Sequence, residues 1–301
     1  MKFTTFILCF FLVIGSAAHS QQTPALSPSA VWASTVEDQY LIYPDVTYGT
    51  ASNYQLKLDV WQHKDSNPGT PTLIYYHGGG WIWGDRTGAT LFFLPYLQMG
   101  WNVVNVEYRM ASVAVAPAAV EDCRCALRWV IQNAKKYNID TTKIVLTGHS
   151  AGGHLALITG MLPPGTGLDN RCYGDEDLKV AAIINWFGPT DVADLAQGPN
   201  LKNYAFMWLG SQPDRLVIAK SVSPLTYVRK GLPPIITIHG DKDEVVPYEH
   251  AVRLHKALNG AGVPNQLITV HGGSHGQFNS DQLQDAYIKI RAFLKERGII
   301  P

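Results

Sequence analysis

Residues 144–153 read Ile-Val-Leu-Thr-Gly-His-Ser-Ala-Gly-Gly, and this stretch decides the fold of the chain. Its apolar start predicts a strand buried on both faces of a sheet, and the apolar residues that continue to Met161 predict a helix. Between the two lies Gly148-x-Ser150-x-Gly152, the pattern of a nucleophile elbow, a turn so tight that glycines must flank the serine. Ser150 could instead cap the helix, but the strand–turn–helix context favours a nucleophile.

The chain on either side of this stretch alternates between strand-like and helix-like segments. Short apolar runs predict further strands at residues 54–61, 72–76, 102–108, 180–186, 235–238 and 267–270. Helical periodicity marks residues 117–134, 248–259 and a last helix ending near Gly298, whereas residues 21–38 have the composition of a loose leader. This alternation predicts an α/β fold in one domain, residues 21–301, with a mainly parallel sheet of about eight strands and helices on both faces.

Two glycine-rich loops follow predicted strands, at the sheet edge where ligands bind in such folds. His77-Gly-Gly-Gly-Trp81 offers amides without a neighbouring Cβ, which suits an oxyanion hole, although a flexible turn or a phosphate loop would look similar. Gly272-Gly-Ser-His-Gly276 carries His275, a candidate base for Ser150. His271 is its main competitor, and we favour His275 because its longer loop can reach the neighbouring strand.

A histidine base needs a carboxylate that holds its tautomer and stabilises the imidazolium. The loop after the predicted strand 235–238 carries three candidates, Asp241, Asp243 and Glu244. The residues alone leave the choice among them open, but the chain order of serine, acid and histidine is the one that a nucleophile elbow accompanies.

Composition and charge exclude several classes of function. The 301 residues include 24 basic and 24 acidic side chains, so the net charge is zero, and 46% of the residues are hydrophobic. Such a chain is not disordered, and it lacks the basic surface that nucleic acids require. The sequence has neither dinucleotide nor P-loop signatures, and neither H-E-x-x-H nor a Cys/His cluster. We therefore expect no cofactor and no metal.

The first 20 residues have the layout of a signal peptide. Lys2 precedes an apolar run from Phe6 to Ile14, and Ala18-x-Ser20 fits a cleavage site. An uncleaved anchor is the alternative, but the run is shorter than the roughly 20 residues of a membrane-spanning helix. We expect a secreted or periplasmic protein that has no membrane attachment after cleavage.

Export would place Cys123, Cys125 and Cys172 in an oxidising compartment. Side chains two positions apart on a helix point in different directions, so Cys123 and Cys125 should not pair with each other. Cys172 could pair with either of them. We favour three buried thiols, because spacing does not determine connectivity.

Together these features resemble the α/β-hydrolase fold, and more narrowly the hormone-sensitive-lipase-like carboxylesterases and their compact bacterial feruloyl-esterase branch. The matching segments, in chain order, are 77–81, 107–109, 117–122, 148–153, 223–226, 239–247 and 275–276. The resemblance implies that Ser150, Asp243 and His275 form a catalytic triad. It also implies a cofactor-free serine esterase for small esters or polysaccharide-linked esters, such as acetyl or feruloyl groups on plant polysaccharide.

The same resemblance implies that the amides of Gly79, Gly80 and Ala151 form the oxyanion hole. The larger members carry an N-terminal cap for which this chain has no room, so residues 189–232 are the only segment that we expect to supply a lid, and the pocket should be open. Aromatic side chains near the strand ends would line this pocket or simply pack beside it. Those that we expect to bind substrate are Trp81, Trp186, Phe187 and Trp208, with Trp83 and Phe206 as further candidates.

Two other functions remain open at this point. An arylformamidase-type amide hydrolase would carry the same oxyanion motif. A non-catalytic binding protein on this fold would be expected to lose part of the triad, and every member is present in this chain.

Overall fold

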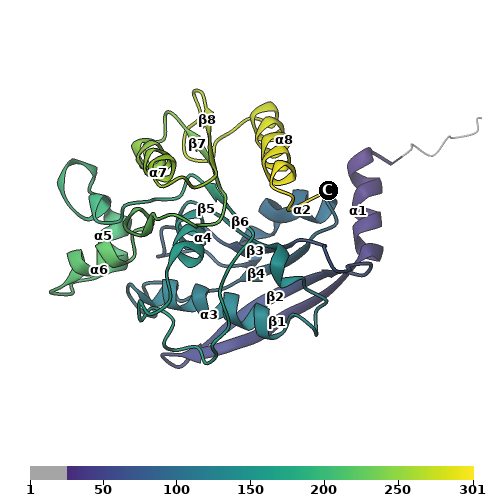
Figure 1. Ribbon diagram of the computed structural model, residues 1–301, viewed down its shortest axis with the longest axis horizontal. Helices are drawn as coiled ribbons and strands as arrows, with labels where there is room; N and C mark the ends of the chain where they lie inside the picture. Colours follow the sequence, from purple (N-terminus) through teal and green to yellow (C-terminus); the bar gives the residue numbers. More distant parts are fainter. Residues whose placement is uncertain (1–25) are drawn as a thin grey trace, which may run out of the picture.

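The computed structural model describes residues 26–301, and a central sheet of eight strands organises them (Figure 1). The predicted signal peptide, residues 1–20, lies outside the described residues. The strand order is β1-β2-β4-β3-β5-β6-β7-β8, with antiparallel pairing of β1 to β2 and of β2 to β4 and parallel pairing elsewhere. The strands are β1 (Tyr40–Ala51), β2 (Tyr54–His63), β3 (Thr72–Tyr76), β4 (Asn102–Val106), β5 (Ile144–His149), β6 (Ala182–Trp186), β7 (Ile235–Gly240) and β8 (Asn265–Val270). The predicted α/β-hydrolase sheet is thus confirmed.

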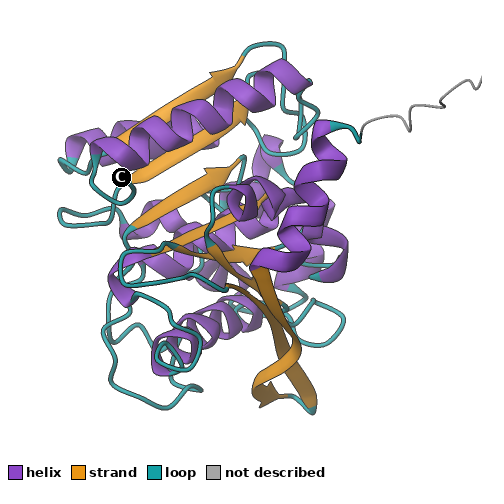
Figure 2. Cartoon of the chain, turned by 90° about the vertical axis from the view of Figure 1, so that its right-hand side faces the viewer, coloured by secondary structure: helices purple, strands orange, loops and turns teal. Residues whose placement is uncertain are grey.

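Helices cover both faces of this sheet. Successive strand residues point to opposite faces, so Ile74 and Leu73 of β3 belong to two separate hydrophobic cores. The helices α3 (Ala118–Gln132), α4 (Ala151–Met161) and α7 (Glu249–Gly260) pack in the first core, and α2 (Leu94–Gln98) and α8 (Ser280–Glu296) pack in the second. Figure 2 shows α8 lying along the last strands of the twisted sheet.

The remaining helices are short or lie outside these two layers. They are α1 (Pro28–Gln39), α5 (Asn203–Leu209), α6 (Arg215–Ser221) and the 3₁₀ turns η1 (Thr87–Phe93), η2 (Thr141–Lys143), η3 (Asp194–Ala196), η4 (Gly198–Asn200) and η5 (Pro224–Tyr227). Figure 1 shows α5 and α6 together at one end of the molecule and α1 at the other. No helix within residues 26–301 is long and apolar enough to cross a membrane.

The start of the described chain corrects one expectation. Residues 28–38 are helical rather than a loose leader, because Ser27 accepts a hydrogen bond from the amide of Ala30 and Pro28 occupies the first turn. None of the residues of α1 is buried, which explains why the sequence shows no apolar stripe there. The strand β1 was not predicted either, because it is an edge strand whose residues are mostly exposed.

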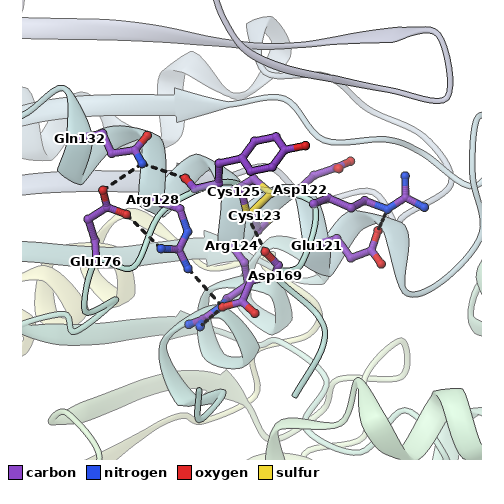
Figure 3. Close-up of a disulfide and its surroundings, with 12 residues drawn as sticks. Glu121, Asp122, Cys123, Arg124, Cys125, Arg128, Gln132, Asp169 and Glu176 are labelled. Carbon is purple, nitrogen blue, oxygen red and sulfur yellow. Dashed lines mark hydrogen bonds and ion pairs between the residues drawn. A yellow bond between two sulfur atoms is a disulfide. The ribbon is translucent and has the colours of Figure 1, made fainter. Parts of the chain in front are cut away.

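A disulfide joins Cys125 of α3 to Cys172, with a Cα–Cα separation of 5.2 Å (Figure 3). The expectation of three free thiols was therefore wrong. Side chains two positions apart on a helix diverge, so Cys123 is buried in the first core while Cys125 faces the loop between α4 and β6. Ion pairs of Arg124 with Asp169 at 2.9 Å and of Arg128 with Glu176 at 3.0 Å hold the same loop.

Candidate active site

The turn between β5 and α4 has the geometry of a nucleophile elbow. Ser150 has φ 57° and ψ −119°, in the left-handed region that side chains rarely adopt. A Cβ on Gly148 would lie 2.4 Å from the carbonyl oxygen of Tyr76, and a Cβ on Gly152 would lie 1.9 Å from the same atom. Both glycines are therefore required for the elbow to pass this close to β3.

The sheet register brings the other predicted residues to the same edge. Tyr76 is the register partner of Gly148, and Gly240 is the partner of Val270, so the loops after β3, β5, β7 and β8 leave the sheet side by side. His275 Nε2 lies 2.8 Å from Ser150 Oγ, and His275 Nδ1 lies 2.8 Å from Asp243 Oδ2. The structure thus brings together the three side chains that the sequence singled out.

The rival pair of residues lies outside this arrangement. His271 Nδ1 lies 3.0 Å from Asp241 Oδ2, and the His271 side chain is 86% exposed. Since His275 is only 21% exposed and contacts Ser150, the structure favours His275 over His271 and Asp243 over Asp241.

The Asp243 carboxylate is fully buried and surrounded by donors. Burial alone would raise its pKa, but the His239 and His275 rings and the amide of Val246 favour the charged form, and the net effect lowers the pKa of Asp243. Its Oδ1 accepts hydrogen bonds from the amides of Val245 and Val246, both at 2.9 Å. The sequence analysis assigned no role to His239, whose Nε2 lies 3.1 Å from Asp243 Oδ2.

The loop after β3 passes directly beside Ser150. Gly79 and Gly80 have φ values of 119° and 60°, which only glycine adopts readily. Neither amide donates a hydrogen bond to another group of residues 26–301, and a Cβ on the preceding Gly78 would lie 3.6 Å from the Ser150 Cβ. Ala151 begins α4, where a helix amide has no partner within the helix. Amides without a hydrogen-bond partner therefore lie in both chain segments that meet at Ser150, the loop after β3 and the start of α4.

Trp81 and Trp208 do not line the cavity, which corrects the prediction that they bind substrate. Both are fully buried, and their rings stack on each other with centroids 4.1 Å apart. Trp81 Nε1 donates to His154 Nδ1 at 3.1 Å, and His154 Nε2 donates to the Val222 carbonyl at 2.7 Å. We call Trp81, His154 and Trp208 together the tryptophan–histidine clasp. It joins the glycine loop, α4 and α5.

A cavity of about 930 Å³ opens above Ser150 and His275. Trp186 and Phe187 line it, whereas Phe206 does not. Its other aromatic walls are Trp83, Phe92, Tyr204, Phe278 and Tyr287. A polar reaction centre thus lies at the floor of a largely apolar cavity.

The outer wall of this cavity comes from a segment other than the expected one. From residues 189–232 only Tyr204 lines the cavity, and its hydroxyl donates to the Val245 carbonyl at 3.0 Å. Residues 83–95, which include η1, supply eight of the residues that line the cavity, and one of them, Leu91, is 75% exposed. Of this segment the sequence singled out only Trp83, which does line the cavity, because the other apolar residues show neither strand nor helix periodicity.

Comparison with known proteins identifies the family. A model of the BD-FAE family matches residues 58–258, a range that begins in β2, ends in α7 and includes Ser150 and Asp243. The chain belongs to the BD-FAE family. The predicted resemblance to hormone-sensitive-lipase-like esterases of the α/β-hydrolase fold is confirmed by the relatives that follow.

Several named relatives of this BD-FAE-family chain are esterases. Esterase LipQ of Mycobacterium tuberculosis is 31% identical over 244 residues, which cover 78% of this chain and 57% of LipQ. The chain spans about half the length of the first curated relatives that it matches.

Solved structures give the same result over a larger share of the chain. A truncated carbohydrate esterase from gut microbiota superposes with a TM-score of 0.71 at 28% identity, covering 87% of this chain and 98% of that one. The Est2 esterase of the planctomycete Thermogutta terrifontis, with propionate bound, gives a TM-score of 0.71 at 27% identity, covering 87% and 96%.

Within residues 26–301, no group of three or more His, Cys, Asp or Glu side chains is placed to hold a metal ion. Ser150 and His275 are the reactive groups that line the cavity, and the buried Asp243 contacts His275 from outside it.

Proposed function

We propose that this protein is an exported serine carboxylesterase that hydrolyses short-chain or aromatic acyl esters. The observation that carries the proposal is the continuous chain of hydrogen bonds from Ser150 through His275 to Asp243, at the floor of an open cavity. The signal peptide predicted for residues 1–20 and the disulfide between Cys125 and Cys172 support the proposed extracytoplasmic location.

The first half of the reaction forms an acyl-enzyme. Ser150 Oγ attacks the ester carbonyl while His275 Nε2 accepts its proton, and Asp243 stabilises the resulting imidazolium. Negative charge develops on the carbonyl oxygen, and the amides of Gly79, Gly80 and Ala151 are the donors that stabilise it. His275 then returns the proton to the departing alkoxide, which leaves as the alcohol.

The second half releases the acid. Water enters the cavity, His275 accepts one of its protons, and the hydroxide attacks the acyl-enzyme carbonyl to form a second oxyanion on the same amides. The Ser150 oxygen leaves and regains its proton from His275. Every proton that moves is held at a nitrogen or oxygen of these side chains, the ester or water, so no cofactor is needed to balance the reaction.

The cavity and the relatives support the proposed substrate class. The aromatic walls suit an aromatic acyl group, and the open side would leave a long alkyl chain in water, where added carbons contribute none of the roughly 0.8 kcal/mol that each buried CH₂ provides. The Thermogutta esterase is described with propionate and with butyrate bound, and another relative is a carbohydrate esterase. We propose acetyl or feruloyl esters of plant polysaccharide as natural substrates.

A panel of esters and one amide tests this proposal. We expect kcat/KM to be highest for p-nitrophenyl acetate, p-nitrophenyl butyrate or methyl ferulate, to fall for p-nitrophenyl decanoate, and to be lost in Ser150→Ala. Release of acetate or ferulate from plant arabinoxylan tests the polysaccharide step. A maximum at eight carbons or longer, or faster turnover of N-formylkynurenine than of every ester, would contradict it.

A further inference from the structure

His149, the residue before Ser150, forms part of the cavity wall that the proposed reaction does not use. Its ring stacks on Trp186 with centroids 5.1 Å apart and an interplanar angle of 13°, and it lies 4.5 Å from the Phe92 ring on centroids. Its backbone is fixed by β5, since His149 is the register partner of Trp186. The imidazole is therefore a rigid, polar ring within an aromatic wall.

The hydrogen bonding of Tyr75 determines which nitrogen of His149 carries the proton. Tyr75 is fully buried in β3, and among residues 26–301 its hydroxyl has one hydrogen-bond partner, His149 Nδ1, at 3.1 Å. A buried phenol that donated to nothing would lose the full free energy of that hydrogen bond. Tyr75 therefore donates to Nδ1, and the neutral ring of His149 carries its own proton at Nε2.

The Nε2 atom of His149 faces the cavity with that proton. It makes no hydrogen bond to residues 26–301. The atom is also not fully buried, so a bound molecule can reach it. His149 is partly exposed and lines the cavity, so the exposed part of Nε2 opens into it. Burial, with a smaller contribution from the nearby His275, lowers the pKa of His149 to about 3, which keeps this donor neutral at all working pH values.

We propose that His149 is a specificity-determining residue, whose Nε2 donates a hydrogen bond to an acceptor oxygen on the flat group of the substrate that this aromatic wall holds. The inference rests on the proposed esterase function and deepens it. A wall built of hydrocarbon alone would bind a plain aromatic ring and its oxygen-bearing analogue about equally. A fixed donor in that wall favours the analogue that carries methoxy, hydroxyl or ether oxygens. Tyr75 acts as a positioning residue that holds the proton at Nε2.

Two pairs of esters test the proposal and locate the oxygen. Methyl cinnamate and methyl 3,4-dimethoxycinnamate differ in acceptor oxygens on the acyl side, whereas phenyl acetate and 4-methoxyphenyl acetate differ on the alcohol side. We expect the unmodified protein to prefer the oxygen-bearing member of one pair by about tenfold in kcat/KM. His149→Phe keeps an aromatic stack without the donor and should bring that ratio close to one. Tyr75→Phe should lower it by roughly threefold.

A control and a binding measurement separate this role from others. His271→Phe changes an exposed histidine outside the cavity and should keep the ratio of the unmodified protein. Calorimetric binding of 3,4-dimethoxycinnamate and cinnamate to Ser150→Ala, with and without His149→Phe, measures the preference without turnover, so a failed esterase assignment and a failed His149 assignment give different results. Unchanged ratios in His149→Phe, or equal losses on all four esters together with equal binding of both acids, would overturn the proposal.

Discussion

Nδ1 of His275 lies 2.8 Å from Oδ2 of Asp243, although the two residues come from the loops of different strands. The carboxylate has no exposed surface, and its second oxygen receives two backbone amides. A charge so enclosed is stabilised because hydrogen-bond donors contact both of its oxygens. The pair thus fixes the His275 ring with Nε2 toward Ser150.

Replacing this carboxylate should cost far more activity than replacing its neighbour. Asp243→Asn should lower kcat by a thousandfold or more, because the amide would hold His275 in the wrong tautomer. Asp241→Asn is the matched control, since Asp241 pairs with the exposed His271, and it should stay within about twofold of the unmodified protein. Steady-state kinetics on p-nitrophenyl acetate compare the two. Greater loss in Asp241→Asn would mean that the acid has been assigned to the wrong aspartate.

The tryptophan–histidine clasp should act on the rate rather than on substrate affinity. Trp81→Phe retains the buried ring but leaves His154 Nδ1 without its donor, which should destabilise the fold by about 1–3 kcal/mol. Trp81 directly follows Gly80 and has a φ of 61°, so loosening its ring should displace the glycine amides and lower kcat by roughly tenfold with little change in KM.

The control for the clasp is Trp83→Phe, which changes the exposed cavity rim instead. That variant should affect KM and leave the free energy of unfolding close to that of the unmodified protein. If Trp81→Phe raises KM and leaves kcat intact, the clasp does not position the glycine loop.

Three buried histidines should make the fold sensitive to mild acid. Burial lowers the pKa values of His154, His250 and His255 to about 4. Between about pH 4 and the ordinary value near 6.5, the unfolded chain binds more protons than the folded one. The free energy of unfolding is therefore highest above pH 6.5. It falls as the pH falls toward 4, by up to about 1.4 kcal/mol per pH unit for each of these histidines.

Urea unfolding at a series of pH values from 5 to 8 measures this dependence. The free energy of unfolding should fall below pH 6.5, and His255→Gln should reduce the slope while His271→Gln, on the surface, should not. A flat profile from pH 5 to 7 in the unmodified protein would show that these histidines are not held neutral by the fold.

The disulfide should contribute stability without contributing to activity. It joins two residues 47 positions apart in the chain, so its removal should lower the free energy of unfolding by roughly 2–4 kcal/mol. Cys125→Ser, Cys172→Ser and the double variant should show the same loss, because each removes the same bond, and kcat/KM should be retained.

Thiol titration checks the pairing directly. Of the three cysteines in residues 21–301, one should react in denaturant before reduction and three should react after it. Three reactive thiols before reduction, or additive losses in the two single variants, would contradict the pairing.

The features that could be predicted from the sequence depend on neighbouring residues or on the order of the strands. The Gly148–Gly153 run identified the elbow because the steric demands of that turn lie within six residues. His275 followed from the position of its loop at the end of β8. The choice of Asp243 needed the family resemblance, since Asp241 follows the same strand and differs only in the direction of its side chain.

Features that depend on packing between distant segments could not be predicted from the sequence. The positive φ of Trp81 turns its ring away from the cavity and onto Trp208, a residue more than a hundred positions later. The partner of Cys172 depends on how the loop between α4 and β6 folds against α3. The polarity of His149 in the cavity wall depends on Tyr75, whose hydroxyl reaches it from the neighbouring strand.

The central claim is that Ser150 is a nucleophile activated by His275, and mass spectrometry of a covalent adduct tests it most directly. A relative, the Thermogutta esterase, is described as phosphonylated by cyclosarin, so a fluorophosphonate is a suitable probe. The unmodified protein should gain one adduct, mapped to Ser150, while Ser150→Ala should gain none and His275→Ala should react at least a hundredfold more slowly. Stoichiometric labelling of Ser150→Ala, or an adduct mapped to another residue, would contradict the account.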